Sequence, residues 1–135
     1  MAGSWLGGRI EASAWTLGLL LGDLAMIGLF VAVGEVRHGG TLAAGLETYG
    51  QFLVGWALVS VPAGVYAPRA LAEARRAVVS VLAAWVLAAI VGVLVRSALR
   101  PGGVIQLSFV AVTIGFGGAF LAAWRFVAVR AVERP

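Results

Sequence analysis

The 135-residue chain contains no cysteine, no lysine and a single histidine. The absence of cysteine excludes disulfide exchange, thiolate metal sites and cysteine nucleophiles. The histidine stands without a second histidine or a cluster of carboxylates, so we expect no metal site. No arrangement of serine, histidine and acid supports hydrolysis either. We therefore expect a protein that is not an enzyme and carries no cofactor.

Charged residues are also scarce. They make up 12% of the chain, against about 25% in soluble domains. Hydrophobic residues make up 61%, and the mean hydropathy is +1.00. This composition predicts an integral, multi-pass protein of the cell membrane, and the length predicts a single domain over residues 1–135. Any function must then be carried out in or at the membrane.

The net charge of +4 comes from ten arginines, most of which flank apolar segments. Basic charge can indicate either a nucleic-acid partner or the topology of a membrane protein. The position of the arginines favours topology, so we expect membrane lipids rather than nucleic acid as partners. The basic connection RALAEARR, residues 69–76, is expected to be attracted to anionic lipid.

Four segments approach the roughly 20 apolar residues that a transmembrane helix needs. They cover residues 13–34, 49–65, 77–95 and 104–127, and glycine, proline and charges gather between them. Within the second segment we expect Pro62 to kink the helix rather than end it. The sequence therefore predicts an all-α integral membrane fold with four transmembrane helices.

Arginine is unevenly distributed over the two sides that four spans define. Four spans place both termini on one side, and seven arginines fall on that side against three on the other. By the positive-inside rule this predicts that both termini lie in the cytoplasm, an N-in and C-in orientation. The seven are Arg9, Arg69, Arg75, Arg76, Arg125, Arg130 and Arg134, and the three are Arg37, Arg96 and Arg100.

Small residues recur at every fourth position in each segment, a spacing that lets helix backbones approach closely. The four rows together favour a compact bundle, although the abundance of glycine and alanine can also produce such rows by chance. The rows are Ala14, Gly18 and Gly22; Ser60 and Gly64; Ser80, Ala84, Ala88 and Gly92; and Ala111, Gly115, Ala119 and Ala123.

Asp23 is the one acidic residue inside an apolar segment, and it lies near the expected midplane. A charged side chain there costs about 2.5–3.5 kcal/mol and usually faces the bundle interior or water. Arg96 and Arg125 lie near the ends of their segments, so we expect each to extend to its own interface. The expected partners at the depth of Asp23 are Ser60, Thr113 and the carbonyl freed by Pro62.

Three interpretations of Asp23 are open at this point. Burial without a cation favours the protonated acid, which can donate a hydrogen bond and hold two helices together. Alternatively, Asp23 forms an intramembrane proton or ion site with Ser60 and Thr113. In the third interpretation Asp23 meets a charge from another chain of an oligomer.

Four further residues are candidates for lining a cavity or contacting lipid, and helix packing is the alternative for each. Two are tryptophans deep in their segments, where the indole N–H needs a partner. Two belong to the glycine-rich stretch GFGG, where backbones can approach closely. They are Trp56, Trp85, Gly115 and Gly118.

Glu35, Arg37 and His38 stand together at the outer end of the first segment. A histidine there can sense external pH, because its charge changes near neutrality. The alternative is that all three are solvated residues of a connection.

Four motifs resemble a known family: GDLAMIGLFVAVGEVRHGG (residues 22–40), GVYAP (64–68), GFGG (115–118) and the pair Trp124 and Arg125. At these motifs the chain resembles a family of small four-span prokaryotic membrane proteins, found mainly in halophilic archaea and catalogued as domain of unknown function 3054. The resemblance implies a four-helix membrane fold and carries no activity with it. Small multidrug transporters are similar in plan only, with four spans and one embedded carboxylate.

Two functions are consistent with these features. The first is a small homo-oligomeric transporter or permeation protein with Asp23 as its proton- or ion-coupled site, because four helices alone enclose only a narrow pathway. The second is a non-catalytic accessory or scaffold subunit that binds lipid, pigment or a larger membrane complex. A hydrated cavity at Asp23 would favour transport, and a dry contact between helices would favour the scaffold.

Overall fold

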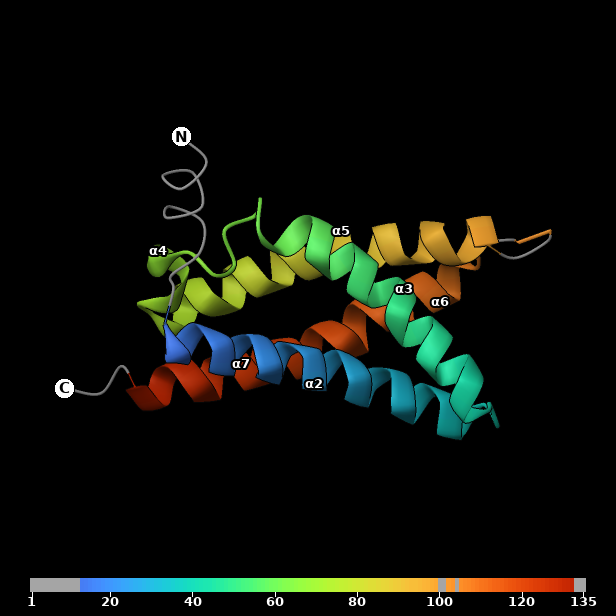
Figure 1. Cartoon of the computed structure of the whole chain (residues 1–135), viewed down its shortest axis with the longest axis horizontal. Helices are drawn as coiled ribbons and strands as arrows, with labels where there is room; N and C mark the ends of the chain where they lie inside the picture. The colour runs from blue at the N-terminus through green and yellow to red at the C-terminus, as the bar shows by residue number, and fades with distance from the viewer. Residues whose placement is uncertain (1–12, 100–101, 104, 133–135) are drawn as a thin grey trace.

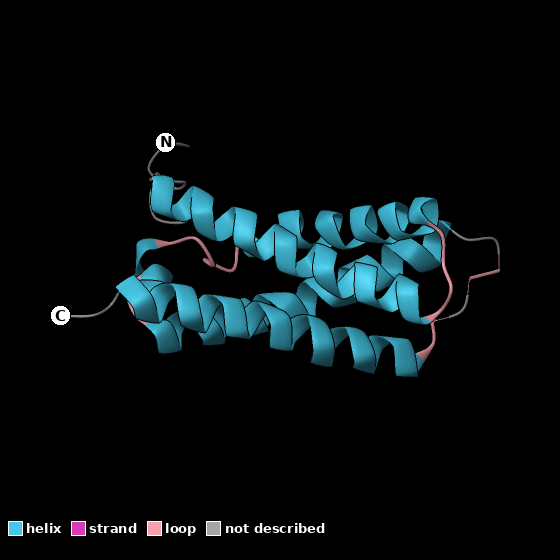
Figure 2. Cartoon of the chain, turned by 90° about the horizontal axis from the view of Figure 1, so that it is seen from below, coloured by secondary structure: helices cyan, strands magenta, loops and turns pink. Residues whose placement is uncertain are grey.

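The computed structural model describes residues 13–99, 102–103 and 105–132, and all elements in these ranges are helices. The helices α2, α3 and α5 and the continuous segment α6–η1–α7 run lengthwise through the molecule, with α3 at an oblique angle to α2 (Figure 1 and Figure 2). The start of α2, the short α4 and the end of α7 lie at one end of the molecule, on the left in Figure 1. The helices are α2 (Ala14–Arg37), α3 (Leu42–Ser60), α4 (Pro68–Leu71), α5 (Ala74–Leu99), α6 (Leu107–Val112), the π-helical η1 (Thr113–Gly117) and α7 (Gly118–Val132).

Three helical segments are long and apolar enough to cross a membrane: Ala14–Arg37, Ala74–Leu99 and Leu107–Val132. They indicate a membrane protein. Large apolar side chains such as Leu21 and Leu87 are exposed on the bundle, as expected of a surface that faces lipid. Helix α3 is not among the three, because its first half carries Glu47, Thr48 and Gln51.

Helix α3 begins and ends earlier than the sequence predicts. It starts at Leu42, where the Thr41 hydroxyl accepts a hydrogen bond from the Ala44 N–H at 3.1 Å, and it ends at Ser60. The expected kink at Pro62 is wrong. Proline lacks an N–H and clashes with the preceding turn, and Gly64 then adopts a positive φ of 76°. The resulting turn directs residues 65 and 66 back toward the bundle.

The core is an aromatic cluster formed by α2, α3, α5 and α6. The Trp85 ring lies at its centre, with ring centroids 5.8 Å from Phe52, 6.3 Å from Phe30 and 6.3 Å from Trp56. Phe109 packs beside Phe52 at 6.3 Å. Aromatic pairs at such distances stabilise a core beyond the area that they bury.

The rows of small residues behave differently in different helices. In α5 the row is a packing face, since Ala84, Ala88 and Gly92 are buried against the bundle. In the last helical segment the row is wrongly predicted to pack inward: Ala111, Gly115, Ala119 and Ala123 are exposed. The inward face there lies two residues further along, because Leu121, Arg125 and Val129 fill the space beside α2 and α5 and Gly117 leaves room for the Trp85 ring. That face consists of Thr113, Gly117, Leu121, Arg125 and Val129.

Candidate functional site

A fully buried ion pair between Asp23 on α2 and Arg125 on α7 forms the centre of the site. Nε of Arg125 donates to Oδ1 of Asp23 at 3.0 Å, and Nη2 donates to Oδ2 at 2.6 Å. Both side chains have 0% relative exposure. Paired hydrogen bonds from a planar guanidinium to a carboxylate are the strongest form of this interaction.

The connection after α3 completes the site. Tyr66 donates its hydroxyl to Oδ2 of Asp23 at 2.6 Å, and the Trp56 indole N–H donates to the same hydroxyl at 3.0 Å. Nη1 of Arg125 donates to the Val65 carbonyl at 3.1 Å, and the guanidinium lies 5.0 Å from the centre of the Tyr66 ring. Val65 and Tyr66, which follow the turn at Gly64, therefore supply three of the contacts that hold the pair.

Tyr66 acts as a donor because it keeps its proton. Burial raises the pKa of Tyr66, which lies outside the helices, and the negative charge of Asp23 raises it further. The hydroxyl therefore donates to Asp23 and accepts from Trp56, which leaves one of its two lone pairs for another donor.

The expectation that Arg125 extends to its own interface is wrong. It assumed that the last span ends near residue 127, whereas α7 continues to Val132. Arg125 thus lies roughly 10 Å inside that end of the helix at 1.5 Å per residue, and Asp23 lies roughly 14 Å inside the start of α2. Side chains tilt toward the N-terminus of their helix, which directs Arg125 inward to the depth of Asp23.

The expectation of a neutral Asp23 is also wrong. Both of its carboxylate oxygens accept hydrogen bonds from an arginine that stays charged. The Tyr66 hydroxyl, which donates to Oδ2, is the third donor to this carboxylate. Asp23 is therefore the charged partner of an intrachain ion pair, and no charge from a second chain is needed to neutralise it.

The structure does not bring together the three residues predicted to form a proton or ion site. Ser60 is buried at the end of α3, but the hydrogen-bond partners of Asp23 are Arg125 and Tyr66. The side-chain oxygen of Thr113 is buried without a hydrogen-bond partner. The Thr113 carbonyl accepts from the Trp85 indole at 3.0 Å, so Thr113 belongs to the aromatic core. The backbone acceptor near Pro62 is the Val65 carbonyl, which binds Arg125 rather than Asp23.

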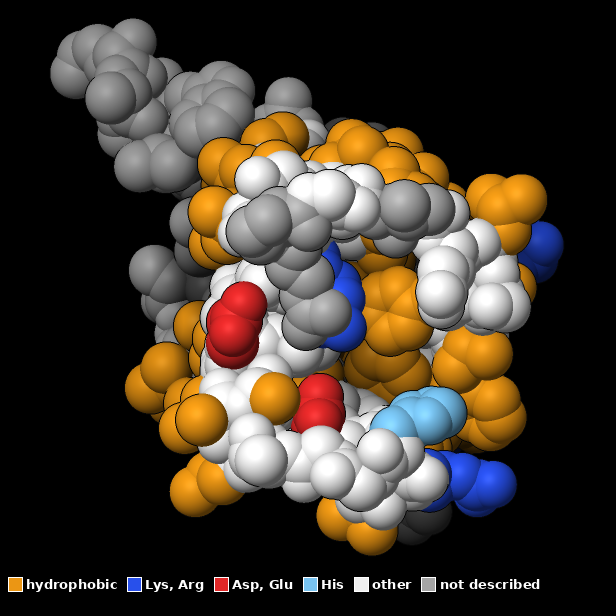
Figure 3. Space-filling view, turned by 90° about the vertical axis from the view of Figure 1, so that its right-hand side faces the viewer, with side chains coloured by type: hydrophobic (Ala, Val, Ile, Leu, Met, Phe, Trp, Pro, Cys, Tyr) orange, Lys and Arg blue, Asp and Glu red, His pale blue; other side chains and the backbone are white. Residues whose placement is uncertain are grey.

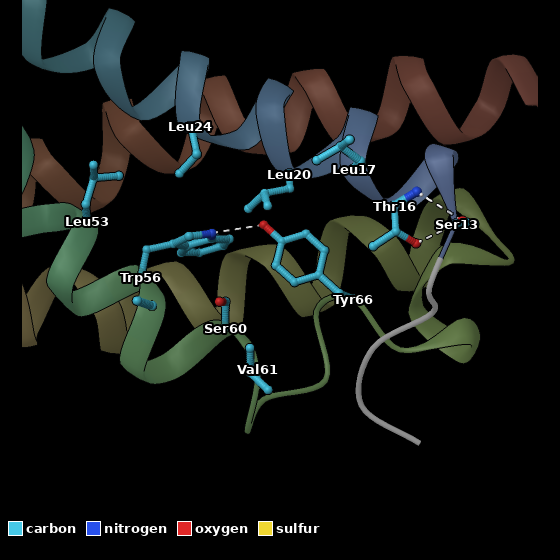
Figure 4. Close-up of a pocket in the computed structure, with 11 residues that line it drawn as sticks. Ser13, Thr16, Leu17, Leu20, Leu24, Leu53, Trp56, Ser60, Val61 and Tyr66 are labelled. Atoms are coloured by element: carbon cyan, nitrogen blue, oxygen red, sulfur yellow. Dashed lines mark hydrogen bonds between the residues drawn. The ribbon is translucent and has the colours of Figure 1, made fainter. Parts of the chain in front are cut away.

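A groove of about 560 Å³ between α2 and α3 adjoins the ion pair. Its volume and mainly apolar lining are typical of small-molecule sites. Tyr66 and Trp56 form one wall, with the Tyr66 hydroxyl beside the Trp56 indole (Figure 4). The hydroxyl-bearing side chains lie toward the start of α2, together with the apolar Leu17 and Val61, and leucines line the deeper half. The polar residues are Ser13, Thr16, Ser60 and Tyr66, and the deeper leucines are Leu20, Leu24 and Leu53.

The remaining candidates divide between core and surface. Trp56 lines the groove, and Trp85 is buried in the aromatic cluster. Gly118 is buried beside Trp85 and Leu82, whereas Gly115 lies on the exposed face. Within the described part of the chain, no three His, Asp or Glu side chains come close enough to hold a metal ion.

Sequence reasoning missed Tyr66 and Arg125 as partners of Asp23. One signal could have found Arg125: a single acid inside one apolar segment implies a buried cation, and Arg125 has apolar residues on both sides, GAFLAAW before it and FVAV after it. Tyr66 carried no comparable signal, because its position depends on how the turn at Gly64 folds back.

The residues that form the ion pair and its hydrogen bonds lie within the part of the chain that matches a protein family. No curated protein and no solved structure matches the chain. A family model described as a protein of unknown function (DUF3054) matches residues 20–128, which include Asp23, Tyr66 and Arg125. The match covers most of the 135 residues, so the chain belongs to this family.

Proposed function

We propose that the chain is a non-catalytic membrane protein that binds a lipid-like amphipathic molecule in the groove between α2 and α3. One observation carries the proposal: the hydroxyl-bearing lining residues lie toward the start of α2, where Leu17 and Val61 also line the groove, and its deeper end is lined by leucines without hydroxyl groups. A polar head group at Ser13 and Thr16 and an apolar chain along Leu24 and Leu53 match that order.

The ion pair supports this function by building a rigid wall. Asp23 and Arg125 neutralise each other, and Tyr66 is held between Asp23 and Trp56. A ligand therefore meets an ordered aromatic surface, so little side-chain entropy is lost on binding. The remaining lone pair of the Tyr66 hydroxyl offers a ligand with an O–H or N–H group one hydrogen bond.

Transport through Asp23 is the second candidate. The observation that favours it is the Tyr66 hydroxyl, which links the groove to the ion pair. In that case a cation or proton entering the groove would compete with Arg125 for Asp23. Equal proton or cation flux through proteoliposomes of the wild type and of Asp23→Asn would remove Asp23 from a transport mechanism.

The proposal includes the arrangement of the chain in the membrane. All four long segments cross the bilayer, α3 included, and both termini face the cytoplasm, as the distribution of arginine predicts. Polar residues in the first half of α3 are tolerated because Thr48 and Gln51 are buried inside the bundle. We also propose that the chain forms a homo-oligomer or joins a larger membrane complex. The exposed apolar faces of its helices would then contact the neighbouring chains.

The test uses a fatty acid with a photoreactive group on its chain. Purified protein in mild detergent is labelled with it, and labelled peptides are identified by mass spectrometry. Saturable labelling in α2 near Leu20 and Leu24, competed by unlabelled fatty acid, is expected. Ala57→Phe places a phenyl ring in the groove. We expect labelling to fall several-fold, because the fatty-acid chain then loses apolar surface that it would otherwise bury against the groove.

The matched control is Ala83→Phe, which adds the same side chain at an exposed position of α5 that does not line the groove. It is expected to label like the wild type. Labelling that is spread evenly over the exposed helix faces and is unchanged by Ala57→Phe would refute groove binding.

A further inference from the structure

A second and smaller groove lies between α2 and α3 at the opposite end of the bundle. Its volume is about 270 Å³, and it adjoins the connection at residues 38–41. Val31, Leu46 and Tyr49 are among its apolar walls, and Glu35 is its one charged lining residue. An apolar groove with one carboxylate at its polar end differs in charge from the larger groove beside the neutral ion pair.

Two glycines let Glu35 lie in this groove. A methyl group on Gly40 would collide with the Glu35 carboxylate, and one on Gly45 would lie 3.2 Å from Glu35 Cγ. The side chain of Glu35 therefore lies across the backbone of the connection and of the first turn of α3, and it is half-buried there. The carboxylate is held at the mouth of the groove rather than extended into solvent.

Among the described residues, the structure contains two ion pairs, Asp23 with Arg125 and Glu73 with Arg76. Within that part of the chain, no arginine lies at ion-pair distance from the Glu35 carboxylate. Arg37 is exposed and two positions further along α2, so it projects from another side of the helix. Acidic side chains (red) are accessible at this end of the molecule (Figure 3). A half-buried carboxylate without an internal partner attracts a cation from outside.

Tyr49 supplies an aromatic wall deeper in this groove, about 10 Å along α2 from Glu35. Its hydroxyl donates to the Leu24 carbonyl at 2.8 Å, which fixes the ring against α2. The ring packs on Gly28, where an added methyl group would lie 3.4 Å from it. The ring therefore offers a fixed apolar surface to the chain of a ligand whose charged end lies at Glu35.

We propose that the smaller groove binds an organic monocation with an apolar chain, of the alkyl quaternary ammonium class. The cationic head contacts Glu35, and the chain lies along Val31, Leu46 and Tyr49. Charge complementarity and the apolar walls carry the assignment. It does not depend on lipid binding in the larger groove, because the two grooves share no lining residue.

The test is calorimetric titration of the purified full chain in maltoside micelles with dodecyltrimethylammonium, with empty micelles as the blank. The uncharged analogue of the same chain length and head-group size is titrated in parallel. We expect the wild type to bind the cation about tenfold or more tightly than Glu35→Gln does, because the half-buried carboxylate contributes most of the charge recognition. The uncharged analogue should bind wild type and Glu35→Gln equally.

Glu47→Gln is the matched control, because Glu47 lies at the same end on α3 but is exposed and does not line the groove. It should keep wild-type affinity. Ala32→Phe fills the groove and leaves Glu35 in place, so it should also lose binding, and it carries the test if Glu35→Gln does not fold. Unchanged affinity in Glu35→Gln or in Ala32→Phe overturns the proposal, as does displacement of the probe by zwitterionic phosphocholine lipid, which would identify a lipid head group instead.

Discussion

The side chains of Asp23 and Arg125 show how a small apolar bundle accommodates two charges. Each polar atom of Asp23 has a donor, and the Arg125 nitrogens are divided between the carboxylate and the Val65 carbonyl. A buried pair is costly to desolvate, and it persists only when such additional hydrogen bonds complete it. The pair therefore connects α2, α7 and the turn after α3.

At the residue scale, removing one partner should be worse than removing both. Asp23→Leu or Arg125→Leu alone leaves a buried charge without its counterion, with an expected loss of about 3–5 kcal/mol. The double variant Asp23→Leu/Arg125→Leu should recover much of that loss. Thermal unfolding followed by circular dichroism in detergent measures all four proteins in one double-mutant cycle.

Strictly additive losses in that cycle would contradict the pair as the source of the effect. Leu21→Ala, at an exposed position two residues before Asp23, serves as the control for truncation on α2 and should cost little.

At the element scale, glycine determines how closely α3 and α5 approach. A methyl group on Gly55 would collide with the Ala88 carbonyl and lie 3.2 Å from the Gly92 nitrogen. The obstruction is backbone, which cannot rotate away as a side chain can. The small residues of α5 thus allow close helix packing, as their spacing predicts, because Gly55 and Phe52 of α3 pack directly against them.

Gly55→Ala should therefore force α3 and α5 apart and lower the unfolding free energy by about 1–3 kcal/mol. Gly18→Ala, where nothing lies within 4 Å of the added methyl group, is the matched substitution on an open helix face. It should be neutral or slightly stabilising, because alanine favours helix by about 1 kcal/mol over glycine. The midpoints of thermal denaturation of both variants in the same detergent decide the comparison, and equal midpoints would contradict close packing at Gly55.

The helical segments themselves were largely predictable, but their ends and faces were not. The first and third segments follow the apolar runs closely, since hydropathy alone makes a long helix there. Helix α3 differs because the Thr41 cap starts it before its most apolar stretch. In the last segment the π-helical turn and the large side chains at the α2 and α5 contacts turn the alanine row outward, which periodicity does not reveal.

At the scale of the whole molecule, the two ends of the bundle differ in charge. Arg75, Arg76 and Arg130 lie with Glu73 at the end where α2 begins and α7 stops, whereas Arg37 and Arg96 lie with Glu35 and Glu47 at the other end. An excess of arginine at one end is the signal that orients membrane proteins, with the basic end in the cytoplasm. Arg125 does not contribute to the charge of the basic end, because its guanidinium is buried in the ion pair with Asp23.

The orientation can be measured without background, because the natural chain has no cysteine. His38→Cys lies in the α2–α3 connection, and Ala72→Cys lies between α4 and α5; both positions are exposed. A membrane-impermeant maleimide should label the His38→Cys protein on intact cells and the Ala72→Cys protein only after lysis. Labelling of Ala72→Cys on intact cells would reverse the proposed orientation.

The sequence by itself determined that this is an apolar, helical membrane protein with one carboxylate inside its first long helix, because composition and run length decide burial in lipid. Only the tertiary structure decided that Arg125 and Tyr66 are the partners of Asp23. These residues are far apart in the chain, and their meeting depends on where α7 ends, which face it turns inward and how the turn at Gly64 folds back. Those features arise from packing between helices, which a single apolar pattern does not encode.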